Sequence, residues 1–166
     1  MPIDFWISAF TTLFVTIDPP GLAPLFLALT SAMDSKARRD VALRGTLIAG
    51  GVLIFFALAG QPFLKLLGIS LPAFRIAGGL LLFWIAFEMV FDRRASRKGD
   101  EAKRAITRDE IRNMAAFPVA MPLIAGPGAI SASILAASEA PDTIALIGFL
   151  GILVLVLAMT LGMLLL

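Results

Sequence analysis

The sequence contains five apolar stretches, each at least as long as the roughly 20 residues with which an α-helix crosses the hydrocarbon core of a bilayer. Hydrophobic residues make up 59% of the chain and charged residues 16%, and the mean hydropathy is +0.94. A soluble domain is much less apolar than this. The short alternating segments typical of a membrane β-barrel are not seen in the sequence. The chain is therefore predicted to be an all-α integral membrane protein.

Polar residues between the apolar stretches set the predicted boundaries. Helices are expected at residues 3–32, 41–67, 73–91, 111–138 and 143–166. We group residues 1–91 as a first three-helix unit, 92–112 as a basic loop and 113–166 as a second, incomplete unit. All but two of the 14 lysine and arginine residues lie in the polar region after the first helix or in the basic loop. The positive-inside rule then puts both regions in the cytoplasm, with the N-terminus outside a bacterial or archaeal cytoplasmic (inner) membrane.

Two of the stretches are interrupted near their middle by proline and glycine. The interruptions are Ile17-Asp18-Pro19-Pro20-Gly21 and Ile124-Ala125-Gly126-Pro127-Gly128. Because proline has no N–H, helical donors to the carbonyls of Val15, Thr16 and Leu123 are lost. Irregular backbone is tolerated at membrane depth only when it is packed in protein or faces a watery cavity. A pair of broken helices in corresponding positions of two halves is typical of the substrate site of a secondary transporter.

The two interruptions also suggest an internal repeat. Aligning Pro20-Gly21 with Pro127-Gly128 places Phe10 on Phe117. The predicted topology runs the two helices in opposite directions, which gives an inverted repeat of three transmembrane helices each (3+3), with the first and fourth helices broken mid-membrane. The second unit lacks its last helix. We expect either a truncated or incompletely covered sequence or a native five-helix protein.

Asp18 is the only acidic residue near the middle of a span. An intramembrane carboxylate by default indicates an ion, proton or substrate site. Asp18 also fits the N-cap of the helix that restarts at Pro19, with its carboxylate accepting the Gly21 N–H, and the two interpretations are compatible. The helix starts at Gly21 and Gly128 suit a carboxylate, and the carbonyls released by proline suit an ammonium group or a small cation.

Together these groups predict a site for a zwitterionic amino acid with a small side chain. The alternative is that the prolines only kink packed helices. The predicted substrate-binding residues are Thr16, Asp18, Pro20, Gly21, Gly126, Pro127, Gly128 and Ser131. Asp18 is also the predicted site of a coupling ion.

Other charged residues are open to two interpretations. Arg75 is a candidate partner for a substrate carboxylate, or it snorkels to the membrane interface. Glu88 is expected to be solvated or paired with Arg93 or Arg94. The basic segments indicate topology or anionic lipid contact rather than nucleic-acid binding. Glycine-rich faces on the second and third helices permit either internal packing or a homo-oligomer.

Several function classes are excluded by composition. The chain has no cysteine and no histidine, which excludes disulfides, thiolate metal sites and catalytic arrangements based on either residue. No nucleophile and base can be paired, so an enzyme is not expected. We predict no metal or other cofactor, apart from Na⁺ or H⁺ as a coupling ion.

Three motifs resemble the MarC family of multi-pass membrane proteins, and the resemblance covers essentially the whole chain. The motifs are Asp18-Pro19-Pro20-Gly21, Gly68-Ile69-Ser70-Leu71-Pro72-Ala73-Phe74-Arg75-Ile76-Ala77-Gly78-Gly79 and Phe117-Pro118-Val119-Ala120-Met121-Pro122-Leu123-Ile124-Ala125-Gly126-Pro127-Gly128. The resemblance implies six helices in two inverted three-helix repeats, and transport of small neutral amino acids such as glycine and alanine. The sequence departs from this pattern in lacking a sixth helix, whose arginine motif would mirror Arg75 to Gly78.

The first functional hypothesis is a secondary transporter for small neutral amino acids, coupled to Na⁺ or H⁺, that works by alternating access around the two breaks. The second is an efflux or permeation protein for other small solutes, such as drugs, which a larger apolar cavity would favour. The third is a membrane scaffold without a transported substrate, which packed breaks without a cavity would favour.

Overall fold

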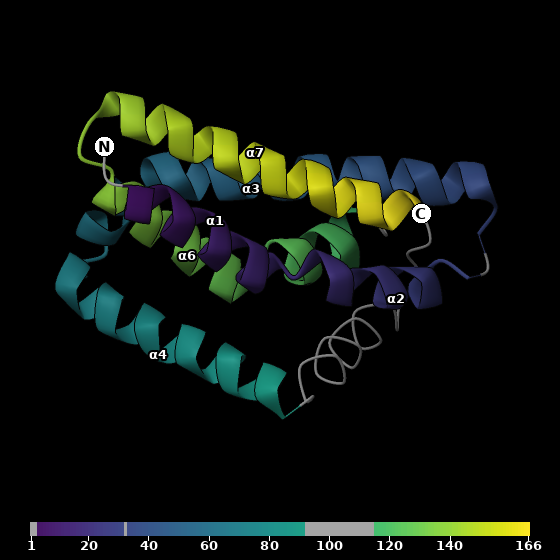
Figure 1. Cartoon of the computed structure of the whole chain (residues 1–166), viewed down its shortest axis with the longest axis horizontal. Coiled ribbons are helices and arrows are strands. Elements are labelled where there is room, and N and C mark those ends of the chain that lie inside the picture. The colour runs from purple at the N-terminus through teal and green to yellow at the C-terminus, as the bar shows by residue number, and fades with distance from the viewer. Residues whose placement is uncertain (1–2, 32, 92–114) are drawn as a thin grey trace.

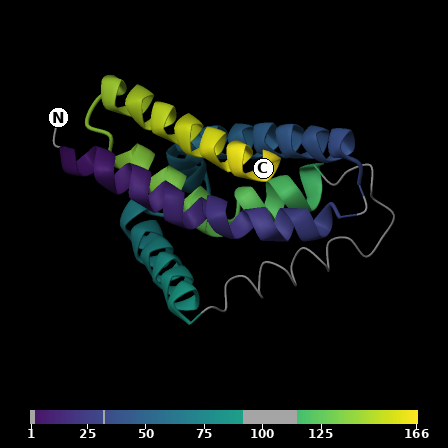
Figure 2. The same cartoon turned by 45° about the vertical axis from the view of Figure 1, so that its right-hand side comes forward.

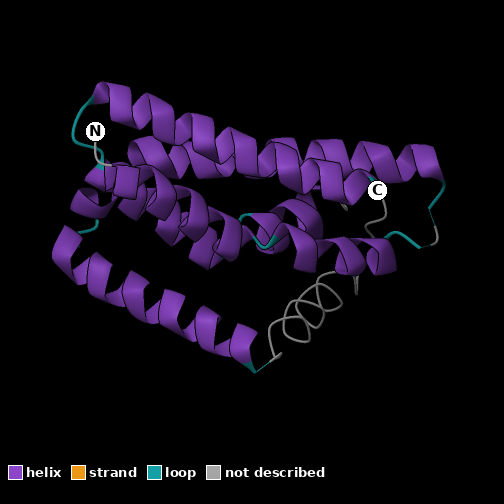
Figure 3. Cartoon of the chain, in the orientation of Figure 1, coloured by secondary structure: helices purple, strands orange, loops and turns teal. Residues whose placement is uncertain are grey.

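The computed structural model describes residues 3–31, 33–91 and 115–166, and every regular element within these ranges is a helix. Figure 3 shows helices joined by short turns. The elements are α1 (Ile3–Ile17), α2 (Pro19–Leu29), α3 (Ser35–Leu66), α4 (Leu71–Val90), the π-helix η2 (Ala115–Ile124), α6 (Pro127–Glu139) and α7 (Thr143–Leu165). The prediction of an all-helical chain is confirmed over these ranges.

Within the described residues, four helical segments are long and apolar enough to cross a membrane. They are Ile3–Leu29, which includes the interruption between α1 and α2, together with Ser35–Leu66, Leu71–Glu88 and Thr143–Leu165. The fourth predicted helix, residues 111–138, is instead divided into η2 and α6, of 10 and 13 residues. Residues 111–114 of that prediction lie outside the described ranges.

Side-chain caps fix where several helices begin. The Asp34 carboxylate accepts the Ala37 N–H at 2.7 Å, and the Asp142 carboxylate accepts the Ala145 N–H at the same distance. Each cap satisfies a backbone donor that has no partner within its own helix. Because of the Asp34 cap, α3 begins at Ser35, earlier than the predicted residue 41. The basic residues that follow Asp34 therefore lie on its first turns.

The helices form a bundle in which α3 is central. Helix α3 packs against η2, α6 and α7, while α1 and α2 lie along α7. Figure 1 shows α7 beside α3, with α1 and α6 beneath them, and Figure 2 shows α4 set apart from the rest. Helix α4 packs chiefly against α6, and most of its surface is exposed. Its large apolar side chains Ile76, Leu80, Phe83 and Trp84 are all more than half exposed, as expected for a face turned to lipid.

Glycine allows close packing at several crossings in the bundle. Close approach at small residues matters because lipid removes the hydrophobic drive that brings helices together in water. A Cβ added at Gly45 of α3 would lie 2.6 Å from Val119 Cγ1 and 3.1 Å from the Ala115 carbonyl oxygen. A Cβ added at Gly60 would lie 2.6 Å from Ile134 Cγ1. These glycines hold α3 against η2 and α6, the two halves of the interrupted segment.

We expect Gly45→Ala to destabilise the bundle by about 1–3 kcal/mol, the usual cost of overpacking a well-filled core. The matched control is Gly51→Ala on the same helix, where an added Cβ meets nothing within 4 Å. The control should be neutral or stabilising, because alanine is the better helix former. Thermal unfolding in detergent, followed by circular dichroism, measures both. Equal unfolding temperatures for the two variants would show that the contact between α3 and η2 is not tight.

Candidate functional site

Asp18 forms the first interruption. Its backbone is left-handed, with φ 60° and ψ 63°, and within the described ranges it is the one residue other than glycine with positive φ. Aspartate tolerates this conformation better than most residues. Its carboxylate accepts the Gly21 N–H at 3.1 Å, and Pro19 occupies the first position of α2. The cap role predicted for Asp18 is therefore present in the structure.

The last helical bond of α1 runs from the Asp18 N–H to the Phe14 carbonyl at 2.8 Å, and the residues that follow cannot continue the pattern. Pro19 and Pro20 cannot donate to the carbonyls of Val15 and Thr16, and the Gly21 N–H is taken by Asp18. Val15, Thr16 and Asp18 all have interaction partners. The Thr16 hydroxyl donates to the Thr12 carbonyl at 2.7 Å, so it is satisfied within α1.

The second interruption has a different design. The Ala125 N–H donates to the Ala120 carbonyl at 2.8 Å, five residues back, which closes the π-helix. Gly126 then turns to an extended conformation, φ −75° and ψ 169°, and α6 begins at Pro127. Glycine has no side chain, so Gly126 gives α6 no side-chain cap. The first N–H groups of α6 are thus the better placed of the two helix starts to bind an external anion.

Gly128, at the second interruption, lies close to Thr16 near the end of α1. A Cβ added at Gly128 would collide with Ile85 Cδ1 of α4 and would lie 4.0 Å from Thr16 Cγ2 of α1. One turn further along α6, Ser131 lies beside Gly78 of α4, whose added Cβ would be 3.7 Å from Ser131 Cβ. The first turns of α6 therefore lie between the end of α1 and one face of α4.

The predicted substrate-binding residues differ in exposure. Thr16, Gly128 and Ser131 are buried, and Asp18, Gly21 and Gly126 are half-buried. Pro20 and Pro127 are exposed, so these two prolines contribute through their backbone rather than through contact at the buried junction.

Arg75 lies at a different level of the bundle. Its guanidinium Nη2 is 3.6 Å from Glu139 Oε1, at the C-terminal end of α6. The 13 residues of α6 put that end about 18 Å from the interruption at a rise of 1.5 Å per residue. The structure thus separates Arg75 from the other predicted site residues.

A small crevice runs inward from this ion pair between α1, α4 and α6. We call it the α1–α4–α6 crevice, and its volume is about 140 Å³. Its lining consists of Phe5, Ser8, Ala9, Thr12, Leu82, Ala132, Leu135, Ala136 and Glu139. Thr12 and Ala132 bring it within one helical turn of Thr16 and Gly128.

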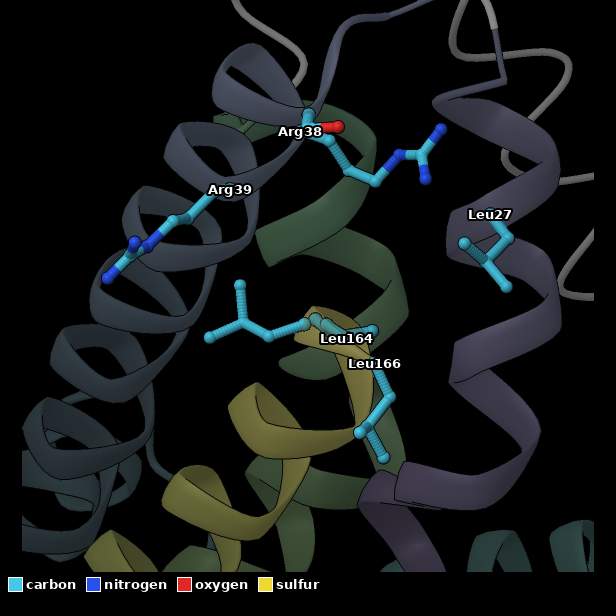
Figure 4. Close-up of a pocket in the computed structure, with 7 residues that line it drawn as sticks. Leu27, Arg38, Arg39, Leu164 and Leu166 are labelled. Carbon is cyan, nitrogen blue, oxygen red and sulfur yellow. The ribbon is translucent and has the colours of Figure 1, made fainter.

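The opposite end of the bundle has a wider hollow of about 410 Å³, between α2, the start of α3 and the end of α7. Figure 4 shows Arg38 extending toward Leu27 of α2, while Arg39 points to the other side and Leu164 and Leu166 lie across from them. Arg38 Nη2 donates to the Thr30 carbonyl at 3.5 Å, at the C-terminal end of α2. Between the two hollows the bundle is packed, with Ile17, Leu22 and Ile124 almost fully buried.

Sequence reasoning misjudged Glu88 and did not single out Ile85 or Glu139. Glu88 is only 5% exposed, so the expectation of a solvated side chain was wrong. Its predicted partners Arg93 and Arg94 lie outside the described residues. Ile85 could not be singled out, because the residues around it in α4 are also apolar. Glu139 was an ordinary acidic residue of a short turn, although the predicted topology already placed it on the same membrane face as Arg75.

Comparison with known proteins identifies the family. Residues 3–166 match the model of the MarC family of integral membrane proteins. The chain is 37% identical over 142 residues to a UPF0056 membrane protein of Archaeoglobus fulgidus, covering 86% of this chain and 66% of that protein. It is 41% identical over 143 residues to one of Methanocaldococcus jannaschii, covering 86% of this chain and 68% of that protein.

A UPF0056 membrane protein of Escherichia coli, YhcE, is 35% identical over 125 residues, which cover 75% of this chain and 58% of that protein. The chain thus spans about two thirds of the length of the curated relatives from the two archaea. No solved structure matches it. From the family match and these identities, the chain belongs to the MarC family of integral membrane proteins.

Proposed function

We propose that the protein is a secondary transporter for small neutral amino acids such as glycine and alanine, coupled to Na⁺ or H⁺. The observation that carries this proposal is the junction at Gly128, where the end of α1, the start of α6 and one face of α4 meet. Paired helix interruptions at one buried level are how many transporters bind substrate and ion near the middle of the membrane.

The junction offers complementary groups for a zwitterion. The uncapped first turn of α6 presents N–H groups with partial positive charge, which suit the substrate carboxylate. Asp18 supplies negative charge for the substrate ammonium or for the coupling ion. Thr16, Gly128 and Ser131 are buried beside these groups and leave little room for a substrate side chain.

The proposed mechanism is alternating access. The α1–α4–α6 crevice lies at one end of the bundle, and the breaks further in are packed, with Ile17, Leu22 and Ile124 almost fully buried. In the proposed cycle the two units, related as inverted 3+3 repeats, rock about the junction and expose it to one side at a time. The N-terminus would lie outside the cytoplasmic membrane and the basic segments inside.

The size of the α1–α4–α6 crevice suits small substrates, whereas the hollow of about 410 Å³ at the other end falls in the drug-sized range. The volume of about 140 Å³ is well below the roughly 300–1,000 Å³ of sites for drug-sized ligands. The efflux alternative would need a larger apolar cavity at the junction. The scaffold alternative is favoured by packed breaks without a cavity, and Ile17, Leu22 and Ile124 at the breaks are almost fully buried, so the flux measurement below decides between transport and a scaffold.

The proposal is tested by uptake of labelled glycine, alanine and phenylalanine into proteoliposomes under imposed Na⁺ and H⁺ gradients, with protein-free liposomes as the control. We expect one of the gradients to drive glycine and alanine to accumulate, and phenylalanine to be excluded by size. Absence of flux under every gradient, from protein shown to be folded, would exclude amino acid transport by this chain.

A further inference from the structure

The ion pair between Arg75 and Glu139 lies at the outer end of the α1–α4–α6 crevice, which Glu139 lines and Arg75 does not. The two charged atoms are 3.6 Å apart, and the side chains are 48% and 55% exposed. An ion pair this exposed contributes little to stability, because solvent screens it and two long side chains must be held in place. Its position at the outer end of the crevice therefore calls for another explanation.

The crevice has the size and the direction of a passage for one small solute. Its volume of about 140 Å³ is several times the roughly 30 Å³ that a water molecule occupies in the liquid. Its polar lining consists of Ser8, Thr12 and Glu139. At its inner end the crevice reaches Thr12, one helical turn from Thr16, whose hydroxyl donates to the Thr12 carbonyl.

We propose that Arg75 and Glu139 form an outer binding site for a small zwitterionic amino acid on its way to the junction. This inference rests on the proposed transport function. A guanidinium binds a carboxylate through paired N–H donors, and a carboxylate accepts from an ammonium group. A zwitterion that inserts between them replaces one ion pair by two, so neither side chain is left without an opposite charge.

The same pairing of charges selects zwitterions over simple anions and cations. An anion such as acetate pairs with Arg75 but faces the like charge of Glu139, and a cation such as methylamine meets the reverse mismatch. Either one leaves a charge uncompensated, which disfavours the wrong ligand. Helix α4 carries Arg75 and packs chiefly against α6, so opening the pair requires only that α4 and α6 separate locally at this end.

The chain has no cysteine, so a single introduced thiol can report on the crevice. We would place it at Thr12 (T12C) and label it in detergent with a charged, membrane-impermeant methanethiosulfonate. We expect glycine to slow labelling, while acetate and methylamine at the same concentration do not. In T12C carrying Arg75→Gln or Glu139→Gln, the glycine concentration for half-protection should rise about fivefold, the scale of one partly screened charge-assisted hydrogen bond.

The charge-reversed pair Arg75→Glu with Glu139→Arg should recover most of the protection. A matched control is Asp40→Asn, which removes another exposed ion pair, Asp40 to Arg44 at 3.0 Å on α3, and should change nothing. Unchanged protection in both single variants, or equal protection by acetate or methylamine, would overturn the outer site.

A second measurement keeps this inference separate from transport itself. Glycine bound at the junction could also shield Thr12, so the labelling is repeated with Asp18→Asn added. Protection that persists there and still depends on Arg75 and Glu139 supports the outer site even if the chain shows no flux. Flux together with protection that ignores both residues would leave transport standing and refute the outer site.

Discussion

Asp18→Asn is expected to abolish gradient-driven uptake of glycine and alanine while the chain remains folded. Asparagine keeps a side-chain acceptor for the Gly21 N–H and is among the residues that tolerate left-handed backbone. The substitution removes only the negative charge. If that charge binds the coupling ion or the substrate ammonium, coupled uptake should fall at least about tenfold, because a charged partner is lost.

Two further variants separate the effect of the Asp18 charge from its role in capping α2. Glycine in Asp18→Gly adopts φ 60° without strain but removes the cap, so the free energy of unfolding should fall only slightly. Asp18→Ala loses the cap as well and adds backbone strain of about 1–2 kcal/mol. All three variants lose the charge, so all three should fail to transport, with stability in the order Asn, Gly, Ala. Uptake by folded Asp18→Asn at the wild-type rate would reduce Asp18 to a helix cap and move the coupling ion elsewhere.

The spanning helices and their interruptions were predictable because both depend on local chemistry. Apolar length sets the spans, and the N–H groups missing at Pro19, Pro20 and Pro127 set the interruptions. The cap by Asp18 followed from its position before two prolines. The π-helix was not predicted. Pro118 and Pro122 within it have no N–H, so neither can donate the hydrogen bond to the carbonyl four residues back that an α-helix requires.

The lateral arrangement of helices was beyond prediction. Hydropathy and charge placed Arg75 and Glu139 on one membrane face, but nothing local made α4 the neighbour of α6. The sequence also did not show which face of α4 packs against α6. Its sequence is apolar all round, so exposed Trp84 and buried Ile85 look alike until the packing against Gly128 is known. From the sequence, the junction could be predicted only from its two interruptions. Ile85, the α4 residue that packs over it, could not be predicted.

Gly128→Ala is expected to destabilise the protein by about 1–3 kcal/mol and to impair uptake, because the new methyl group meets Ile85 Cδ1 at the junction. Ile85 is 5% exposed, and its branched side chain has few alternative rotamers in a helix. The strain would then fall on the contact between α4 and α6. The control is Gly151→Ala on α7, where an added Cβ meets nothing within 4 Å.

Ile85→Val removes the Cδ1 atom that the new methyl group would strike. Alone it should cost about 0.5–1.5 kcal/mol through lost packing. In the double variant the next contacts of the added Cβ are Ile85 Cγ1 at 3.8 Å and Thr16 Cγ2 at 4.0 Å, both ordinary van der Waals distances. Unfolding and uptake should therefore recover together when Ile85→Val is added to Gly128→Ala, giving a favourable coupling in the double-mutant cycle. Additive losses would mean that α4 does not cover the start of α6, and the junction on which the transport proposal depends would be wrong.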